Sequence, residues 1–264
     1  MDKYIDKFSL KGKIIIITGG CGLIGKAFVK ACLQYEANVI VADTPQSKPN
    51  DFAKSLKSTF EDRVLGVNVD VSSRSSLKNL LNIVLKTFGS INGLVNAHQC
   101  KTANFFDKFE NYEDKDWDDI IKINLKGTFL TCQILGSWMA ENNGGCIVNI
   151  PSTYSVVAPN QNLYKGTSLG TPAAYSASKG GVQAFSQYLS TYWASKNVRV
   201  NQLTPHGVWN NHEKKFEENF SKLSPLKRMS YNHEVAPALI YLLSDASSYV
   251  TGHNLVIDGG WTAW

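Results

Sequence analysis

Residues 14–25 of the chain read IIIITGGCGLIG. Four consecutive isoleucines without polar alternation predict a strand that is covered on both faces. The glycine-rich turn after this strand leads into residues 23–36, whose apolar side chains have helical spacing. Glycines allow a tight turn and let the backbone approach a pyrophosphate, and the N–H groups at a helix N-terminus attract anions. The stretch therefore predicts a strand–turn–helix unit that binds a dinucleotide.

The rest of the chain repeats the alternation of strand and helix. Apolar runs rich in β-branched residues recur at 38–43, 63–70, 91–97, 145–150, 198–205 and 254–258, and helical spacing at 74–88, 116–140 and 173–196. This order is typical of a doubly wound sheet. We expect an α/β protein with one Rossmann domain over residues 1–264 and a mainly parallel seven-stranded sheet.

Two segments, 153–172 and 206–233, break the alternation. Both follow predicted strands, and ligands of such sheets bind beyond the carboxyl ends of the strands. We therefore place both segments beside the active site. Residues 208–233, rich in charged and aromatic side chains, are expected to form a mobile flap on the substrate side.

Composition limits the class of protein. With 264 residues and 43% hydrophobic composition, the chain can bury one substantial core. The net charge of +5 is scattered, so we expect no nucleic acid partner and a weak preference for an anionic small substrate. The five cysteines show neither a CxxC pair nor metal-ligand spacing, which predicts a reduced setting and no metal. The sequence shows no signal peptide and no apolar run long enough to span a membrane, so a cytoplasmic protein without a membrane partner is expected.

Two acidic residues follow predicted strands near the glycine turn. Asp43 ends the second strand roughly 20 residues beyond the glycines, where a carboxylate can accept hydrogen bonds from ribose hydroxyls. Its charge would repel a 2′-phosphate, so NAD(H) is preferred over NADP(H). The alternative is an aspartate that only caps a loop. Asp70 and Val71 close the third strand and are expected to flank the adenine, although Asp70 is also explained as a turn residue.

Tyr175 and Lys179 occur in AAYSASKGGV, a segment with helical spacing. Residues four apart share one helix face, so the ammonium lies near the phenol. A nearby positive charge lowers the pKa of a tyrosine from about 10, which makes the phenol a usable acid or base. The alternative for this spacing alone is a surface pair.

Two further polar residues are candidates for the site. Ser152 follows the strand in GCIVNIPS, where its hydroxyl can bond a reacting oxygen, or can only form a turn. Asn124 lies in the apolar helical run IIKINLKGTF, where an amide is disfavoured without a specific role. Its alternative role is to stabilise a kink by bonding to the backbone.

Together these segments resemble the short-chain dehydrogenase/reductase family over nearly the whole chain. The resemblance is carried by TGGCGLIG, Asp70, INLKGTF, NIPS, YSASK, VRVNQLTP and TGHNLVIDGG. It implies that Tyr175 is the general acid/base, that Ser152 orients the substrate oxygen, that Lys179 holds the nicotinamide ribose and that Asn124 supports a water-linked proton path. The expected cofactor contacts are Gly19, Cys21, Gly22, Leu23, Ile24, Gly25, Asp43, Asp70, Val71, Asn96, Tyr175, Lys179, Pro205 and Val208.

The chain departs from the family pattern at two places. Asn96-Ala97-His98-Gln99 stands where the family usually has Asn-Asn-Ala-Gly, and Pro205-His206 stands where it has Pro-Gly. His98 and His206 are candidate substrate contacts, against the alternative of ordinary polar loop residues. The first departure also motivates an alternative function, a cofactor-binding scaffold with weakened catalysis.

Ser152 and Tyr175 are separated by about ten residues more than the family normally has. An insertion between two catalytic residues begins and ends at the site, so Tyr154, Tyr164 and Lys165 are its expected substrate contacts. With the ending DGGWTAW, it resembles oxidoreductases of bacterial surface-sugar pathways, such as the flagellin modification protein A group of nonulosonic-sugar synthesis. That resemblance implies oxidation of a phosphorylated or nucleotide-linked sugar, or the reverse. Reduction of a non-sugar carbonyl remains open.

The final segment, 252–264, is aromatic and apolar. Such a segment would leave exposed patches on a monomer. The family resemblance implies that these tails pack between subunits, so a homotetramer is expected, with a homodimer next.

Overall fold

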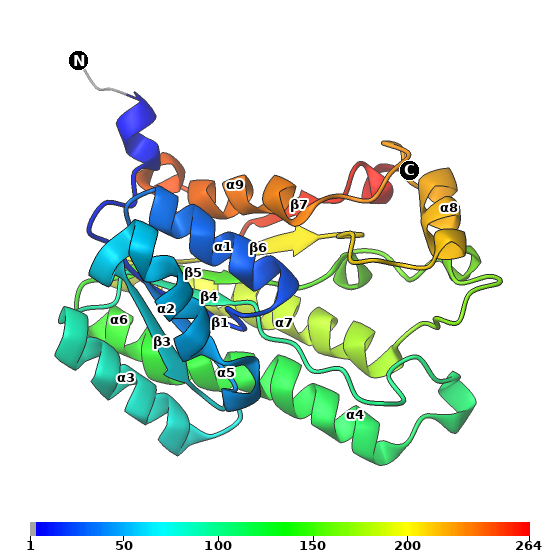
Figure 1. Ribbon diagram of the computed structural model, residues 1–264, viewed down its shortest axis with the longest axis horizontal. Coiled ribbons are helices and arrows are strands. Elements are labelled where there is room, and N and C mark those ends of the chain that lie inside the picture. Colours follow the sequence, from blue (N-terminus) through cyan, green and yellow to red (C-terminus); the bar gives the residue numbers. More distant parts are fainter. Residues whose placement is uncertain (1–3) are drawn as a thin grey trace.

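The computed structural model describes residues 4–264, in which a seven-stranded sheet lies between two layers of helices (Figure 1). The strand order is β3-β2-β1-β4-β5-β6-β7 and every neighbouring pair is parallel. The prediction of a single-domain, doubly wound α/β fold is therefore confirmed. The strands are β1 (Ile14–Thr18), β2 (Asn38–Asp43), β3 (Val64–Asn68), β4 (Gly93–Asn96), β5 (Gly145–Asn149), β6 (Val198–Pro205) and β7 (Asn254–Ile257).

Helices connect the strands on both faces of the sheet. Separate α-helices are α1 (Leu23–Gln34), α2 (Pro49–Phe60), α3 (Arg74–Phe88), α7 (Ala173–Tyr192), α8 (Lys214–Leu223) and α9 (Asn232–Leu243). A continuous helical stretch contains α4 (Asp114–Ile120), α5 (Gly127–Thr131) and α6 (Ser137–Glu141), joined by π-helical turns at Ile121–Lys126 and Cys132–Gly136.

The isoleucines of β1 explain why the sheet needs two helical layers. Ile15 and Ile17 belong to the core that α1 and α9 complete, whereas Ile14 and Ile16 belong to the core on the α3 side. Successive side chains of a strand point to opposite faces. Because helices cover both faces, every position of β1 from Ile14 to Ile17 is apolar, and each fully buried isoleucine contributes roughly 1.5–3 kcal/mol.

The predicted element boundaries differ from the structure in a few places. Strands β3 and β4 are shorter than the predicted runs 63–70 and 91–97, and α7 ends at Tyr192 rather than at residue 196. Helices α2 and α9 were not predicted; α9 contains Pro237, a residue that usually ends a helix. Within residues 206–233 the structure contains helix α8.

The topology fixes where a ligand binds. Strand β1 pairs with β2 on one side and with β4 on the other, so the crossovers leave β1 and β4 in opposite directions. At such a switch point a crevice opens beyond the carboxyl ends of the strands. Among the helices described in residues 4–264, none is long and apolar enough to cross a bilayer.

Candidate functional site

A cavity of about 670 Å³ lies at the carboxyl ends of the strands. Its wall runs from Asp43 at the end of β2, past Gly19 after β1, to Tyr175 on α7 and Phe216 on α8. This volume falls within the usual range of ligand pockets. The cavity therefore extends from the predicted cofactor residues to the two segments that break the strand–helix alternation.

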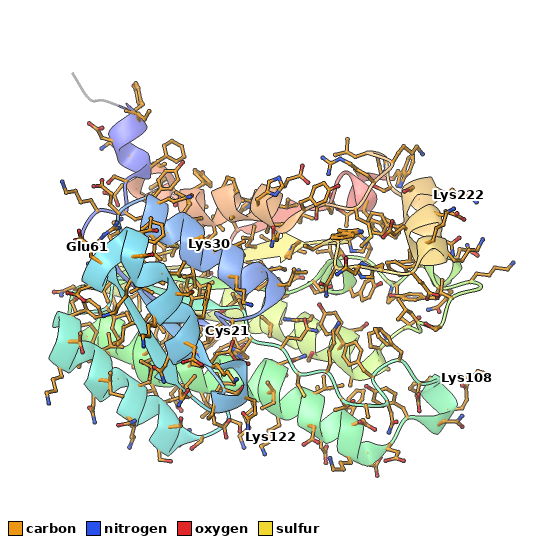
Figure 2. The ribbon with its side chains drawn as sticks, in the orientation of Figure 1. Cys21, Lys30, Glu61, Lys108, Lys122 and Lys222 are labelled. Carbon is orange, nitrogen blue, oxygen red and sulfur yellow. The ribbon has the colours of Figure 1, made fainter. Side chains whose placement is uncertain are left out.

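The glycine turn after β1 requires its glycines. Gly19 has a φ of +69°, and a Cβ there would lie 2.6 Å from the His98 backbone nitrogen. A Cβ on Gly25 would overlap the carbonyl oxygen of Gly19. Gly22 caps α1, and the cavity wall includes Gly22, Leu23 and Ile24 at the N-terminal end of that helix, next to Cys21, which Figure 2 labels. The turn thus presents the first N–H groups of a helix to the cavity, as a pyrophosphate requires.

Asp43 orders the turn from the end of β2. One carboxylate oxygen accepts a hydrogen bond of 2.9 Å from the Cys21 N–H, and the other accepts one of 2.8 Å from the Thr44 N–H. The wall residues at this point are Asp43, Thr44 and Ser47, and none of them carries a positive charge.

Asp70 and Val71 also line the cavity. The Asp70 carboxylate accepts hydrogen bonds from the N–H and the hydroxyl of Ser72, at 2.8 and 2.7 Å. The side chain of Asp70 therefore stabilises a turn. What this segment offers a ligand is the wall that it forms with the buried Val71.

Three of the four predicted catalytic residues meet at the other end of the cavity wall. Ser152 follows β5, and its hydroxyl is a neighbour of the Tyr175 phenol that lowers the pKa of that phenol. The Lys179 ammonium lies 5.6 Å from the centre of the Tyr175 ring and donates a 2.7 Å hydrogen bond to the Ile150 carbonyl. All three side chains line the cavity. The structure thus brings together a phenol, a hydroxyl and a buried ammonium.

Burial controls the protonation of this group. It raises the pKa of Tyr175 by more than the neighbouring Ser152 hydroxyl lowers it. The expectation that Lys179 lowers the pKa of this phenol was wrong for the protein without ligand, because burial outweighs the other influences. Burial also lowers the pKa of Lys179 to about 8. At neutral pH the phenol therefore carries a proton that it can donate.

Asn124 is not on the cavity wall. Its side-chain oxygen accepts a 2.8 Å hydrogen bond from the Cys100 N–H, and its amide donates to the Ser178 hydroxyl at 3.1 Å. The residue is 1% exposed and sits in the π-helical turn at Ile121–Lys126. This geometry matches the alternative role, in which the side chain bonds to the backbone at an irregular turn.

Asn96, predicted to touch the cofactor, is also absent from the cavity wall. Its amide nitrogen donates to Asn149 and its oxygen accepts from Thr131, both at 2.8 Å. Buried amides need partners. Here the partners are inside the protein, so Asn96 joins the ends of β4 and β5 to α5.

His98 is a buried, neutral histidine. Its Nδ1 lies 2.7 Å from the Thr18 hydroxyl, and burial lowers its pKa to about 3. Gly127 leaves room for the ring, since a Cβ there would lie 3.1 Å from the His98 Nε2. The bulky residue at this departure from the family pattern is therefore accommodated between β1 and α5.

His206 lines the cavity, and its side chain makes one hydrogen bond within the described residues. Its Nδ1 lies 2.6 Å from the Thr153 hydroxyl, its ring centre lies 4.4 Å from that of Trp261, and its Nε2 has no hydrogen-bond partner within the described chain. Burial lowers its pKa to about 4, so the ring is neutral at physiological pH. Gly207 follows with a φ of +55°, where a Cβ would overlap the Phe220 ring.

Of the three predicted contacts in the insertion, two line the cavity. The hydroxyls of Tyr154 and Tyr164 hydrogen-bond each other, and the Tyr154 ring packs edge-on against Tyr175 at 6.3 Å. Burial raises the pKa of Tyr164 to about 12. Lys165 is exposed and is not on the wall; only its carbonyl is engaged, by the Asn219 amide at 2.9 Å.

Helix α8 packs against segment 153–172 at the substrate end of the cavity. Phe216 and Phe220 are buried, and the Asn219 amide donates to the carbonyls of Leu163 and Lys165 at 3.1 and 2.9 Å. These contacts tie segment 206–233 to segment 153–172. The structure shows that this segment contains a helix whose apolar face lines the substrate end of the cavity, and its mobility stays a prediction.

The chain end contributes to the same cluster. Trp261 is 6% exposed and stacks on Phe220 at 5.1 Å, whereas Trp264 is 74% exposed. The expectation that this segment exposes its aromatic side chains holds for Trp264 and is wrong for Trp261, because Trp261 packs within its own chain.

Sequence reasoning missed much of the substrate-side wall. Its apolar members are Phe105, Phe106, Leu163, Phe216, Phe220 and Met229, and its charged or titratable members include Lys101 and His212. The sequence signal that could have identified such wall residues is a pair of aromatic residues in an irregular segment, such as FF at 105–106. The substrate-side wall therefore combines these apolar side chains with the two tyrosines of the insertion, Tyr154 and Tyr164.

Comparisons with known proteins agree with this geometry. Residues 22–262 match the family described as Enoyl-(acyl carrier protein) reductase. The chain is 32% identical to the NAD-dependent glycerol dehydrogenase of Listeria innocua, over 98% of both chains. It is 30% identical to the post-translational flagellin modification protein A of Campylobacter coli, over 96% of this chain and 99% of that protein.

A solved structure resembles the whole chain. The gluconate 5-dehydrogenase of Burkholderia cenocepacia, in complex with NADP and tartrate, superposes with a TM-score of 0.88 at 25% identity, covering 99% of this chain and 100% of that one. These matches cover nearly the full length of the chain. The glycine turn and the Ser152–Tyr175–Lys179 group agree with the family that the matches indicate. The chain belongs to the short-chain dehydrogenase/reductase family, and its relatives include dehydrogenases and reductases that act on CH–OH groups.

Proposed function

We propose that the protein interconverts a secondary alcohol and a ketone on a small polyol or sugar, with Tyr175 as the general acid/base. The observation that carries the proposal is the meeting of Ser152, Tyr175 and Lys179 on the wall of a cavity that also contains the glycine turn. The dehydrogenase relatives support a hydroxylated substrate.

The side chains divide the proton chemistry among them. Ser152 orients the reacting oxygen towards Tyr175, whose phenol donates a proton during reduction and accepts one during oxidation. Lys179 supplies a buried positive charge that stabilises the phenolate when it forms. When bound, the nicotinamide cofactor supplies or accepts the hydride.

NAD(H) is the proposed cofactor. The glycine turn, the N-terminus of α1 and the Asp43 carboxylate fit a dinucleotide, and the wall at Asp43, Thr44 and Ser47 offers no cation to a 2′-phosphate. The glycerol dehydrogenase relative is described as NAD-dependent, whereas the gluconate dehydrogenase was solved with NADP.

The more specific substrate that we propose is a phosphorylated or nucleotide-linked sugar of bacterial surface-glycan synthesis. The similarity to flagellin modification protein A supports it. The apolar wall formed by Phe105, Phe106 and Phe216 favours one alternative, reduction of a non-sugar carbonyl. Assaying sugar phosphates, sugar nucleotides and apolar ketones in parallel separates the two.

The test of the proposed chemistry is Tyr175→Phe. Turnover should fall by about 10²–10⁴-fold, because the proton-transfer group is lost, while NADH binding stays within twofold. Dehydrogenase assays and NADH fluorescence titrations measure the two quantities. Tyr249→Phe, which removes an exposed phenolic hydroxyl that is not on the cavity wall, is the control and should leave turnover unchanged. Normal turnover by Tyr175→Phe would overturn the assignment.

A homotetramer is the proposed assembly. On α7, Tyr188 and Tyr192 are 58% and 60% exposed and stack with ring centres 5.5 Å apart, and Trp264 is also exposed. Aromatic side chains gathered on a surface are typical of protein contacts. Light scattering that detects only a monomer would refute the proposal.

A further inference from the structure

Lys101 is a charged residue of the cavity wall that the proposed chemistry leaves without a role. It lies in the segment that follows β4, is exposed, and places its ammonium 5.7 and 5.9 Å from the ring centres of Phe105 and Phe106. Aromatic faces attract a cation without neutralising it. The two rings therefore keep the ammonium at the wall while its charge remains available.

Lys101 forms no ion pair within residues 4–264. In the part of the chain that the structure describes, all four ion pairs involve other residues. The acidic residues of the wall are Asp43 and Asp70, which belong to the cofactor end. The cavity is therefore acidic at the end of β2 and cationic beyond β4.

The charge of Lys101 affects the pKa of His212, another residue of the cavity wall. Burial lowers the pKa of this histidine most, the Lys101 charge lowers it further, and the Glu217 carboxylate partly offsets both by raising it. The His212 Nδ1 accepts a hydrogen bond from the Asn210 N–H at 3.2 Å, so the neutral ring carries its proton on Nε2. Both residues belong to the cavity wall, and together they offer an ammonium and an N–H donor but no carboxylate.

We propose that Lys101 binds an anionic group of the substrate, a carboxylate or a phosphate, and so selects acidic sugar derivatives over neutral polyols. This inference rests on the proposed alcohol–ketone chemistry and specifies the substrate class. A charge-assisted hydrogen bond is roughly twice as strong as a neutral one. A neutral hydroxyl at the same place gains less.

Three ligands with the same six-carbon skeleton test the proposal: D-sorbitol, D-gluconate and D-sorbitol 6-phosphate. Binding is measured by calorimetry to the NAD⁺-loaded Tyr175→Phe protein, so that no ligand is consumed. Lys101→Gln and Lys101→Arg are then added to this background. Lys108→Gln is the matched control, because Lys108 is exposed at the outer end of the same segment, where Figure 2 labels it, and is not on the cavity wall.

At least one anionic ligand should bind more tightly than sorbitol and lose about 10- to 100-fold in affinity in Lys101→Gln. Sorbitol affinity should change less than twofold, Lys101→Arg should restore most of the loss, and Lys108→Gln should have no effect. If only gluconate loses affinity in Lys101→Gln, the bound group is a carboxylate. If only sorbitol 6-phosphate loses affinity, the bound group is a phosphate. Preferred binding of sorbitol, equal losses for all three ligands, a loss confined to NAD⁺ affinity, or binding of none of them would overturn the proposal. Failure of the redox chemistry is distinguished by turnover of the protein with Tyr175 intact.

Discussion

The buried ammonium of Lys179 predicts a stability that depends on pH in a defined direction. The residue is 4% exposed, and burial lowers its pKa from 10.5 to about 8. Because the folded state binds this proton less tightly than the unfolded state, folding is penalised wherever the group is charged. The penalty is complete below about pH 8 and disappears as the pH rises through 10.5, so stability increases with pH in that window.

The size of the effect is set by the two pKa values. A difference of 2.5 between 10.5 and about 8 corresponds to about 3 kcal/mol at roughly 1.36 kcal/mol per pKa unit. Between pH 7 and pH 9.5, about 2 kcal/mol of this penalty should be relieved. Lys179→Met removes the titration. The unfolding free energy of the original protein minus that of Lys179→Met should therefore rise by about 2 kcal/mol over this range.

Urea unfolding at a series of pH values, without cofactor, measures the difference. Subtracting the variant cancels the titration of the groups that do not interact with Lys179. The lost hydrogen bond to the Ile150 carbonyl shifts the whole difference curve without changing its slope. Lys78→Met on the exposed face of α3 is the control for replacing a surface lysine. A flat or falling difference curve would show that Lys179 is not a desolvated cation and would refute the reasoning.

Two predictions concern the cofactor end. Gly25→Ala should weaken NADH binding at least tenfold and lower the melting temperature, because its Cβ would overlap the Gly19 carbonyl; Gly180→Ala, with nothing within 4 Å of its Cβ, should be neutral or slightly stabilising. Equal NADH affinities of these two variants in fluorescence titrations would contradict the first. Asp43→Ala should lower the ratio of NAD⁺ to NADP⁺ affinity about tenfold or more, because hydrogen bonds to a charged group are worth about 1.5–3 kcal/mol. Calorimetric titration with both nucleotides measures that ratio, and an unchanged ratio would argue against a ribose-binding carboxylate.

The sequence predicted the sheet well because its strands are covered on both faces. An unbroken apolar run such as IIII at 14–17 has few alternatives to a buried strand, and the glycine turn marks where the next helix begins. Helix α9 was harder to predict, since Pro237 interrupts its pattern. Helix α8 was also harder to predict, because most of its side chains are charged or polar. Its two phenylalanines are buried by residues that are distant in the sequence.

The sequence indicated which site residues lie together where their placement depends on local geometry. The spacing of Tyr175 and Lys179 on one helix is a local property, and the structure places both on the cavity wall. The direction of the Tyr175 pKa could not be read from that spacing, because burial by distant segments dominates it. Asn96 has internal partners that come from other elements, so no sequence pattern near it indicated that it would turn away from the cavity.

The hydrogen bonds from Asn219 to the carbonyls of Leu163 and Lys165 link segments separated by 56 and 54 positions along the chain. For protein engineering, this means that the wall at the substrate end of the cavity consists of two interdependent pieces, segments 153–172 and 206–233. Transplanting either piece alone from a relative would leave a buried amide or two carbonyls without partners, at a cost of about 1–3 kcal/mol for each group. A swap of substrate preference by loop grafting should therefore exchange both pieces at once.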